Sequence, residues 1–288
     1  MTGRRTVPLV AEGFSIRAAR PRDRRGVKAL CARIWPDDYV PEVFDDWVRD
    51  RRGRLWVAVT AERVIGVAKL TVMGEREAWL HALRVDPDHR KRGVATALLA
   101  HRLARARRLG ARVARLDTAE DNVAIHRLMR RNGFRRVERI KYYHARPTSD
   151  DPPRLVRARE LAEAWRLSRG RLFHEDYVAR ALARSDIARA IRRRECFAVG
   201  PPGRPSAVAI AAAQRRSRWM GRSRLRIRLV AGARSDVREL LVALRGQARV
   251  ARVDRAGIAP PSELWSVVSA AGYRRRWHEA MDVFERRL

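Results

Sequence analysis

The stretch Arg90–Ala95 (RKRGVA) stands between an apolar run at Trp79–Val85 and an amphipathic run at Thr96–Leu109. This order predicts a strand, a short basic turn that contains a glycine, and a helix. The first N–H groups of a helix have no partner within the helix and stand at the positive end of its dipole, so they attract anions. Gly93 would let a phosphate approach the backbone, because a Cβ there would collide with it. The six residues alone also fit an ordinary glycine turn before a surface helix.

The residues around this turn carry two further patterns. Leu83–His89 (LRVDPDH) precedes the turn, and Asn122 is followed by a predicted helix and then by Asn132-Gly133-Phe134. With these motifs, in this order and spacing, the chain resembles the GCN5-related N-acetyltransferase (GNAT) family, whose signature turn reads Arg/Gln-x-x-Gly-x-Gly/Ala. The resemblance covers residues 14–146. It implies an α/β (α+β) fold, with a mixed, mostly antiparallel, splayed sheet flanked by helices, and it implies acetyl-CoA as the co-substrate.

The composition is that of a folded protein without a membrane span. Hydrophobic residues make up 46% of the 288 residues, and no uninterrupted apolar run is long enough to cross a bilayer. The first residues are not followed by the apolar segment of a secretory signal. Cys31 and Cys196 lie one in each half, which argues against disulfides and a metal site and favours a reduced, cytoplasmic compartment.

The formal net charge of +33 would attract polyanions such as nucleic acid or the ribosome. The basic residues are spread evenly along the chain, however, and aromatic residues do not alternate with arginines as a stacking platform for bases requires. Solvated arginine faces are the simpler interpretation. Nucleic acid is therefore a partner that is not favoured, and no membrane partner is expected.

The chain is long enough for two domains, and it repeats itself in outline. ARVARLD at 111–117 recurs as ARVARVD at 248–254, and NGFRR at 132–136 recurs as AGYRR at 271–275. Chance similarity in a chain rich in arginine and alanine is the alternative to a duplication. We expect a flexible arm at 1–13, a GNAT domain at 14–147, a polar, proline-containing linker at 148–153 and a second GNAT-like domain at 154–288.

The hydrophobic periodicity predicts the same element order in both halves. The first half is expected to have strands at 14–19, 55–60, 64–73, 79–85, 113–117 and 135–145, and helices at 21–35, 41–52, 96–109 and 122–131. The second half is expected to have strands at 155–159, 196–199, 207–213 and 225–230, with helices up to residue 194.

The second repeat lacks the phosphate-binding pattern. Leu229–Asp236 occupies the place of the turn but contains no Arg/Gln-x-x-Gly-x-Gly/Ala, and Asp236 at the start of the helix would repel a phosphate. Alanine and proline at 259–261 replace the counterpart of Asn122. We therefore expect one cofactor site per chain and a degenerate C-terminal repeat that supports the structure or shapes the acceptor site.

The resemblance implies which residues of the first repeat would bind CoA. The turn would hold the pyrophosphate, and the backbone of strand 79–85 would bind pantetheine, with the N–H region of Val85 polarising the thioester carbonyl. Asn122 matches a family asparagine that contacts CoA, and it would equally cap the helix that follows. The expected cofactor-binding residues are Leu83, Arg84, Val85, Arg90, Lys91, Arg92, Gly93, Val94, Ala95, Thr96 and Asn122.

The catalytic base is predicted on the strand before the turn. Trp79, His81, Leu83 and Val85 would share one face of a regular strand. Family members often carry a glutamate base there, and His81 lies on that face in its place. An imidazole suits proton transfer near neutral pH, although a structural histidine in a half-buried strand is the alternative.

The catalytic acid is where the chain departs from the family pattern. The usual tyrosine is replaced by Met129, which cannot donate a proton. The candidates to replace it are His126, one turn earlier on the same helix, and Tyr142 or Tyr143 on the last strand. A thiolate would also leave without a dedicated acid, since a free thiol has a pKa of only about 8.5.

Residues 37–50 give the one indication of the acceptor. They hold six carboxylates and a single arginine, in the region that walls the acceptor site in the family. This predicts a cationic amine, such as a lysine, a basic peptide N-terminus or a polyamine, unless the carboxylates only stabilise a helix N-terminus. Trp35, Tyr39, Phe44 and Trp47 would line the same site or pack in the core.

Together, these observations predict an N-acetyltransferase that moves an acetyl (or other acyl) group from acetyl-CoA to a primary amine by direct attack in a ternary complex. One alternative is a non-catalytic acyl-CoA-binding sensor, which Met129 favours. The other is a basic tRNA- or ribosome-associated protein that uses the GNAT scaffold for docking.

Overall fold

A computed structural model describes residues 10–11, 13–50, 53–61, 63–73, 76–175, 178–215, 222–276 and 278–288. These residues form two compact units, each built from separate stretches of the chain. Unit 1 takes in the chain up to Leu116 together with Leu128–Arg135 and Glu285–Leu288, and unit 2 consists of Asp117–Arg127 and Arg136–Phe284. The units differ from the expected contiguous domains, because residues 136–147 fall in unit 2 and the last four residues fall in unit 1.

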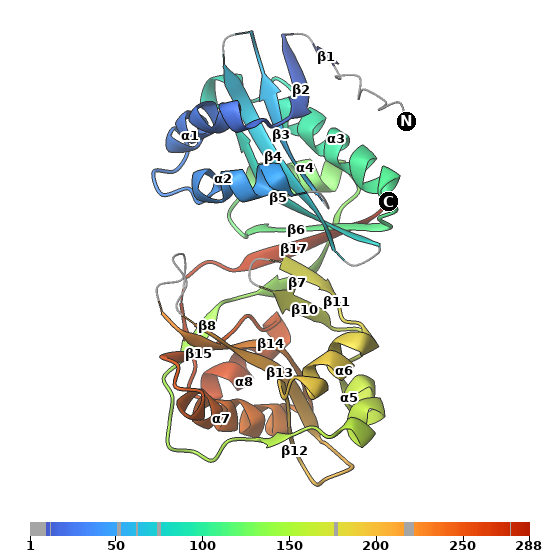
Figure 1. Cartoon of the computed structure of the whole chain (residues 1–288), viewed down its shortest axis with the longest axis vertical. Coiled ribbons are helices and arrows are strands. Elements are labelled where there is room, and N and C mark those ends of the chain that lie inside the picture. The colour runs from blue at the N-terminus through green and yellow to red at the C-terminus, as the bar shows by residue number, and fades with distance from the viewer. Residues whose placement is uncertain are drawn as a thin grey trace. The chain divides into compact units, whose positions relative to one another are not determined.

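The first half of the chain follows the expected order of elements (Figure 1). The elements are β1 (Val10–Ala11), β2 (Phe14–Ala18), the 3-10 turn η1 (Pro21–Asp23), α1 (Arg24–Ala32), α2 (Val40–Arg49), β3 (Arg54–Val59), β4 (Val64–Met73), β5 (Glu77–Val85), η2 (Pro87–His89), α3 (Val94–Arg108), β6 (Val113–Ala119), α4 (Val123–Arg131), β7 (Arg135–Ile140) and β8 (Tyr143–Ala145). Residues 1–9 and 12 of the expected arm lie outside the described residues, and β1 pairs antiparallel with β2.

Unit 1 buries apolar side chains on both faces of its strands. One cluster packs Val27 and Leu30 of α1 and Phe44 of α2 against the sheet, and another packs Val94 and Leu98 of α3 against the opposite face. Strands covered on both faces have few polar positions, which explains the almost continuous apolar runs of β3 and β4.

The last strand of the chain completes the first sheet. Among the described residues this sheet has the order β1-β2-β3-β4-β5-β6-β17-β7, where β17 is Met281–Arg287. The expected single strand at 135–145 is therefore wrong: it is split at residues 141–142, and β8 pairs with β15 and β16 of the other sheet. Charge explains why the end of β17 belongs to unit 1, because the buried Arg115 guanidinium of β6 donates to Glu285 at 2.7 and 2.9 Å.

Unit 2 contains the second sheet, in the order β16-β8-β15-β14-β13-β12-β9 among the described residues. Its elements are β9 (Arg154–Leu155), η3 (Ala158–Glu160), α5 (Leu161–Ser168), β10 (Leu172–Glu175), β11 (Val178–Ala181), α6 (Arg184–Arg192), β12 (Cys196–Val199), β13 (Ala207–Gln214), β14 (Arg224–Gly232), α7 (Arg234–Val250), β15 (Arg255–Ile258), η4 (Ser262–Leu264), α8 (Trp265–Ala270) and β16 (Arg274–Arg275). The expected strand at 155–159 is only two residues long, and the hairpin β10–β11 interrupts the expected helices before 194.

One local motif occurs in both halves at the repeat distance. Asp23 accepts hydrogen bonds from the Arg17 guanidinium (2.6 and 2.7 Å) and from the Arg20 N–H (2.7 Å). Glu160 accepts from the Arg154 guanidinium (3.0 and 2.9 Å) and from the Arg157 N–H (2.8 Å), and each of these three residues lies 137 positions after its counterpart. The shared strand-to-helix turn favours a duplication over chance similarity.

The expected linker is packed in unit 2. The Thr148 N–H donates to the Arg245 carbonyl at 3.4 Å, and a Cβ added to Gly246 of α7 would lie 2.0 Å from the Asp150 carbonyl oxygen. Across the part of the chain that the structure describes, no helix combines the length and the apolar character that crossing a bilayer demands.

Candidate active site

Strand β5 carries a bulge directly before the turn. The register with β4 passes from Val67↔Arg84 to Lys69↔His81, so that Ala82 and Leu83 stand opposite the single residue Ala68. Ala82 has a φ of 51°, which an L-residue adopts only when its surroundings enforce it.

The bulge separates side chains that a regular strand would place together. Leu83 and Val85 pack with the cluster on the α3 side, whereas Ala82 packs with the cluster on the α1–α2 side. The His81 ring lies 5.6 Å from the ring of Trp47 on α2. The expectation that His81 shares a face with Leu83 and Val85 is therefore wrong, because one extra residue resets the alternation of the strand.

The same strand separates from its neighbour. β5 pairs in parallel with β6 only at Glu77–Trp79, opposite Val113–Arg115, although β5 runs on to Val85. Within the described residues, the backbone from Leu80 onward has no strand partner on that side. Two carbonyls of this stretch accept side-chain donors instead, His81 from Arg102 at 3.2 Å and Leu83 from Arg84 at 3.3 Å.

The turn that follows presents the start of α3 to solvent. Gly93 has a φ of 79°, precedes the first helical residue Val94, and accepts the Ala97 N–H at 2.9 Å. Arg90, Lys91 and Arg92 are exposed, and the first turn of α3 contains no acidic residue. A Cβ added to Gly93 would meet no protein atom within 4 Å, so the space above the turn is open. An open helix N-terminus with three cations fits a phosphate group.

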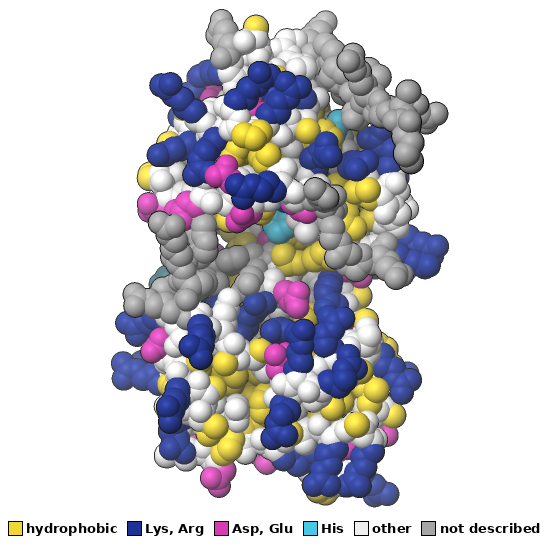
Figure 2. Space-filling model, in the orientation of Figure 1, with side chains coloured by type: hydrophobic (Ala, Val, Ile, Leu, Met, Phe, Trp, Pro, Cys, Tyr) yellow, Lys and Arg dark blue, Asp and Glu magenta, His cyan; other side chains and the backbone are white. Residues whose placement is uncertain are grey.

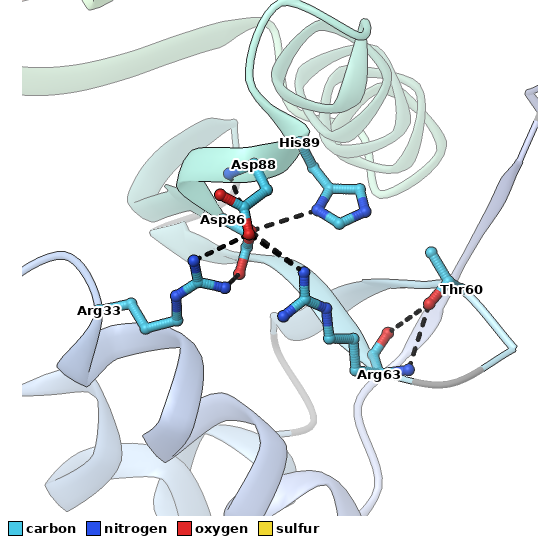
Figure 3. Close-up of polar contacts among 6 residues, drawn as sticks. All are labelled: Arg33, Thr60, Arg63, Asp86, Asp88 and His89. Atoms are coloured by element: carbon cyan, nitrogen blue, oxygen red, sulfur yellow. Dashed lines mark hydrogen bonds and ion pairs between the residues drawn. The ribbon is translucent and has the colours of Figure 1, made fainter.

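A buried carboxylate, Asp86, lies where the chain passes from β5 toward this turn (Figure 3). Asp86 is 2% exposed and accepts from the Arg33 guanidinium at 2.8 Å and from the Asp88 N–H at 3.0 Å. Its other contacts are Arg63 at 3.7 Å and the His89 ring at 3.2 Å, and Arg33 also bonds Asp88 at 2.9 Å. The cluster connects α1, the β3–β4 hairpin and η2, which fixes the point where β5 passes into the turn.

His81 lies next to two buried cations. The Arg102 guanidinium is fully buried and donates to the His81 carbonyl at 3.2 Å, and Lys69 stands opposite His81 in the β4–β5 register. Burial lowers the pKa of His81 to about 3, and the charges of Lys69 and Arg102 act in the same direction. His81 is neutral at physiological pH, but it is a much weaker base than an ordinary histidine.

The acidic segment 37–50 is largely neutralised by neighbouring cations. The Arg84 Nε donates to Asp38 at 2.7 Å, and the Arg84 guanidinium lies 4.5 Å from the Trp35 ring centre. Further ion pairs join Asp45 to Arg24, Asp46 to Arg49, and Asp50 to the buried Lys69. Of the aromatic residues in this region, Phe44 is core, whereas Trp35 and Tyr39 are 50% and 41% exposed.

Asn122, which lies in unit 2, caps a helix. Its side-chain oxygen accepts the Ile125 N–H at 3.3 Å, and its carbonyl accepts the His126 N–H at 3.0 Å. The capping role anticipated from the sequence is therefore present.

The acid candidates also lie in unit 2 and have structural contacts. The His126 ring nitrogen Nε2 lies 3.1 Å from the Ala119 carbonyl, and its ring contacts Phe284 edge-on. Tyr143 is 5% exposed in β8. Met129 of α4 belongs to unit 1 and is buried, so it provides packing rather than a proton.

Asp117 of unit 2 is a titratable group that no motif of the sequence singles out. Asp117 follows the buried apolar residues of β6, and burial raises its pKa to about 7, against the opposing effect of His174. The one sequence signal is an acidic residue near the end of a buried strand. No group of three or more His, Cys, Asp or Glu side chains within the described residues is placed to hold a metal ion.

The counterpart turn in unit 2 differs from the first in its charge and in the packing of its glycine. A Cβ added to Gly232 would lie 2.5 Å from both the Ser206 carbonyl oxygen and the Ala207 Cβ. Asp236 stands in the first turn of α7, and the Arg234 guanidinium bonds the Glu263 carbonyl (2.6 Å) and the Ser266 hydroxyl (2.7 Å). The start of α7 is exposed, but the carboxylate of Asp236 and the engaged guanidinium of Arg234 leave it without the charge that favours a phosphate.

Part of the chain matches a known protein family. Residues 21–134 match the model of the Acetyltransferase (GNAT) family, so the segment that holds the bulged strand and the open turn belongs to that family. No curated protein matches the chain by sequence.

Two solved structures share the fold over almost the whole chain. One is a GCN5-related N-acetyltransferase from Sphaerobacter thermophilus, with 15% identity, 96% of each chain covered and a TM-score of 0.65. The other is the GCN5-related glucosamine N-acetyltransferase region of a fungal multi-domain GH3 β-N-acetylglucosaminidase, with 15% identity and a TM-score of 0.66; the match covers 96% of this chain and 38% of that one. At this identity the likeness shows the fold: two sheets with flanking helices, as the resemblance implied.

Proposed function

We propose that the protein is an acetyl-CoA-dependent N-acetyltransferase that acetylates a primary amine by direct attack in a ternary complex. The observation that carries the proposal is the open N-terminus of α3 at Gly93, with Arg90, Lys91 and Arg92 around it and no carboxylate in its first turn. The family of residues 21–134 supports acyl transfer as the reaction class.

The residues of the turn would bind the pyrophosphate of CoA. The N–H groups of Val94, Ala95 and Thr96 lie in the first helical turn and have no partner within the helix. Arg90 and Arg92 add charged hydrogen-bond donors. When bound, acetyl-CoA supplies the acetyl group as a reactive thioester.

The unpaired backbone of β5 would orient the thioester. The bulge at Ala82–Leu83, held by the bond from Arg102 to the His81 carbonyl, sets the direction of the N–H groups at Leu83, Arg84 and Val85. An N–H group aimed at the thioester oxygen stabilises the charge that develops there when the amine attacks. Asn122 is proposed as a further CoA contact, in addition to its role as a helix cap.

Proton transfer would involve a group with a suitable pKa. His81 is the base that the sequence predicts, but a pKa of about 3 leaves it able to accept a hydrogen bond and poorly able to hold a proton. His126 and Tyr143 are retained as candidates for the acid, although their present contacts are structural.

The acceptor is proposed to be a cationic amine, on a small molecule or a peptide. Asp37 and Glu42 are exposed in the acidic segment, beside the exposed rings of Trp35 and Tyr39. Because Asp38, Asp45 and Asp50 already have cation partners, the support for this acceptor is narrower than the sequence indicated.

The C-terminal half is proposed to be a degenerate GNAT repeat without a CoA site of its own, supported by the recurring Arg–carboxylate turn and by Asp236 in the first turn of α7. A cytoplasmic location also belongs to the proposal, since Cys31 and Cys196 are both buried free thiols.

The sensor alternative is favoured by one observation, the buried Met129 in place of a proton donor. The RNA-docking alternative has less support. Figure 2 shows Lys and Arg side chains scattered over the visible face of each unit, with hydrophobic and uncharged areas between them rather than one basic stripe.

An assay of CoA release from acetyl-CoA, run with a panel of amines, tests the proposal. The test variant is Gly93→Asp, which places a carboxylate in the open turn. Its matched control is Gly110→Asp, because Gly110 has a φ of 82° and equally open space but lies just beyond the other end of α3. We expect Gly93→Asp to abolish amine-dependent release and Gly110→Asp to retain it. Equal rates in the two variants would exclude the turn as the CoA site, and binding without release for every amine would favour the sensor.

A further inference from the structure

One side chain of unit 1 joins strand β5 to the connection between α1 and α2, which is residues 33–39. Arg84 of β5 donates through Nη1 to the Leu83 carbonyl at 3.3 Å, directly after the bulge. Through Nε and Nη2 it donates to the Asp38 carboxylate of the connection, at 2.7 and 3.4 Å. The same guanidinium therefore contacts the strand that would orient the thioester and the segment expected to wall the acceptor.

The Asp38 carboxylate is buried and also bonds the start of α2. Its side chain is 1% exposed, against 13% for the side chain of Arg84. It accepts the N–H of Val40, the first residue of α2, at 3.1 Å. Because water has little access to this ion pair, salt screens it less than an exposed pair. Removing one partner would leave the other as a buried charge without compensation.

A second ion pair joins the same two segments in the opposite direction. Arg33, the first residue of the connection, donates to the buried Asp86 at 2.8 Å, and Asp86 follows the last residue of β5 (Figure 3). One arginine comes from the strand and the other from the connection, so residues 33–39 are restrained at two points against the end of β5. A buried ion pair adds little stability over apolar residues of similar volume, and its best-attested effect is to specify one arrangement.

Arg84 also contacts the exposed aromatic rings of the connection. Its guanidinium lies 4.5 Å from the Trp35 ring centre and 6.0 Å from the Tyr39 ring centre, and these rings are 50% and 41% exposed. The Tyr39 ring meets the Trp47 ring edge-on at 5.8 Å, and Trp47 lies 5.6 Å from the His81 ring of β5. A row of rings thus leads from solvent to β5, and its two outer members, here called the aromatic wall, contact Arg84.

We propose that Asp38 and Arg84 are positioning residues for the acceptor amine, and that their ion pair holds the aromatic wall in place relative to the strand that orients the thioester. This role rests on the proposed transferase function. It assigns the Arg84 side chain to the acceptor, whereas the Arg84 N–H belongs to the backbone expected to bind CoA. Attack on a thioester requires the amine nitrogen to be placed to within about 1 Å, so a shift of the aromatic wall lowers the rate although no reacting group is lost.

The test compares Asp38→Asn with Asp23→Asn in the full-length protein. Asp23 is the matched control, because it is another buried carboxylate of unit 1 that accepts two bonds from one arginine and one from a backbone N–H, but it lies before α1 rather than after it. CoA release is measured with spermidine, Nα-acetyl-lysine and a short peptide with a free N-terminus as the amines, and acetyl-CoA binding by titration calorimetry.

We expect Asp38→Asn to lower kcat/KM for the amine by about tenfold or more and to leave the Kd of acetyl-CoA unchanged. Asp23→Asn should lower the melting temperature and change neither constant. Arg84→Lys, which keeps the positive charge, should retain more of kcat/KM than Arg84→Gln.

Hydrogen exchange provides a readout that needs no turnover. Amides of residues 33–39 should exchange faster in Asp38→Asn than in the wild-type protein, and at the wild-type rate in Asp23→Asn. Equal exchange or equal kcat/KM in the two variants, or a loss of acetyl-CoA affinity in Asp38→Asn as large as its loss of kcat/KM, would overturn the positioning role and leave the proposed function standing. Failure of the wild-type protein to release CoA with any amine would overturn the proposed function, and the positioning role with it.

Discussion

The helices α3 and α7 begin in the same topological place, after a bulged strand that has separated from its neighbour, yet their first turns differ. The β13–β14 register also shifts, between Ile210 and Ala211, and β14 pairs with β15 only as far as Ile227 although it runs on to Gly232. At α3 the start of the helix is open and cationic, whereas at α7 Asp236 adds a negative charge and the Arg234 guanidinium bonds Glu263 and Ser266. The scaffold is thus common to both units, and a few residues decide whether a helix start can bind a phosphate.

The largest expected effect is on stability, and it distinguishes Gly232, before α7, from Gly93, before α3. Gly232→Ala should destabilise the protein by about 3 kcal/mol or more, because its Cβ would overlap the Ser206 carbonyl oxygen and Ala207. Gly93→Ala meets no atom and should cost only about 1 kcal/mol for its positive φ. Chemical denaturation measures both values, and similar losses for the two variants would contradict the comparison.

Arg92 at the start of α3 and Arg234 at the start of α7 should also have different roles, the first in binding and the second in stability. Arg92→Gln should weaken acetyl-CoA binding by about tenfold, as it removes a charged donor to phosphate. Arg234→Gln should lower the melting temperature without affecting acetyl-CoA binding, since its guanidinium bonds Glu263 and Ser266. Calorimetry and thermal denaturation of both variants test this, and an effect of Arg234→Gln on binding would show that the second turn also contacts CoA.

Asp23 and Glu160, the carboxylates of the motif found in both halves, predict that the protein loses stability as the pH falls. Burial alone would raise the pKa of Glu160, but hydrogen bonds from Arg154 and from the Arg157 and Gly203 N–H groups lower it to about 2. A carboxylate with a depressed pKa stabilises the fold above its unfolded pKa of about 4.3, and that contribution is lost as the pH falls toward 2.

Glu160→Gln should therefore destabilise the protein at pH 7 and much less near pH 2.5. Asp23→Asn should behave in the same way in unit 1, because hydrogen bonds from Arg17 and Arg20 lower the pKa of Asp23 despite its burial. Denaturation curves at a series of pH values measure both, and a pH-independent difference would rule out the proposed linkage.

The smallest expected effect concerns the catalytic base. Because the pKa of His81 is about 3, His81→Phe should lower the rate without changing the pH–rate profile between about pH 5 and pH 8. An acid limb near neutral pH that disappears in His81→Phe would restore histidine as the base.

Much of this comparison could be predicted from the sequence. The apolar runs and the glycines located both helix starts, and Asp236 already indicated that the second would not bind phosphate. Those features are local, and a pattern of a few residues determines them. The roles assigned to individual CoA-site residues stay predictions.

The features that sequence reasoning missed depend on long-range contacts. The bulge at Ala82–Leu83 has no local signature, since neither residue is a glycine, and it alone removed His81 from the face of Leu83 and Val85. The low pKa of His81 arises from burial and then from the charges of Lys69 and Arg102, which lie 12 positions before and 21 after it. The place of β17 in the first sheet likewise depends on residues far apart, such as Arg115 and Glu285.

The most direct test of the central claim is the number of acetyl-CoA molecules bound per chain, measured by titration calorimetry on the wild-type protein and on Gly93→Asp. One open helix start predicts one site, and the variant should show none while Gly110→Asp keeps it. Two sites per chain, or one that survives Gly93→Asp, would contradict the account.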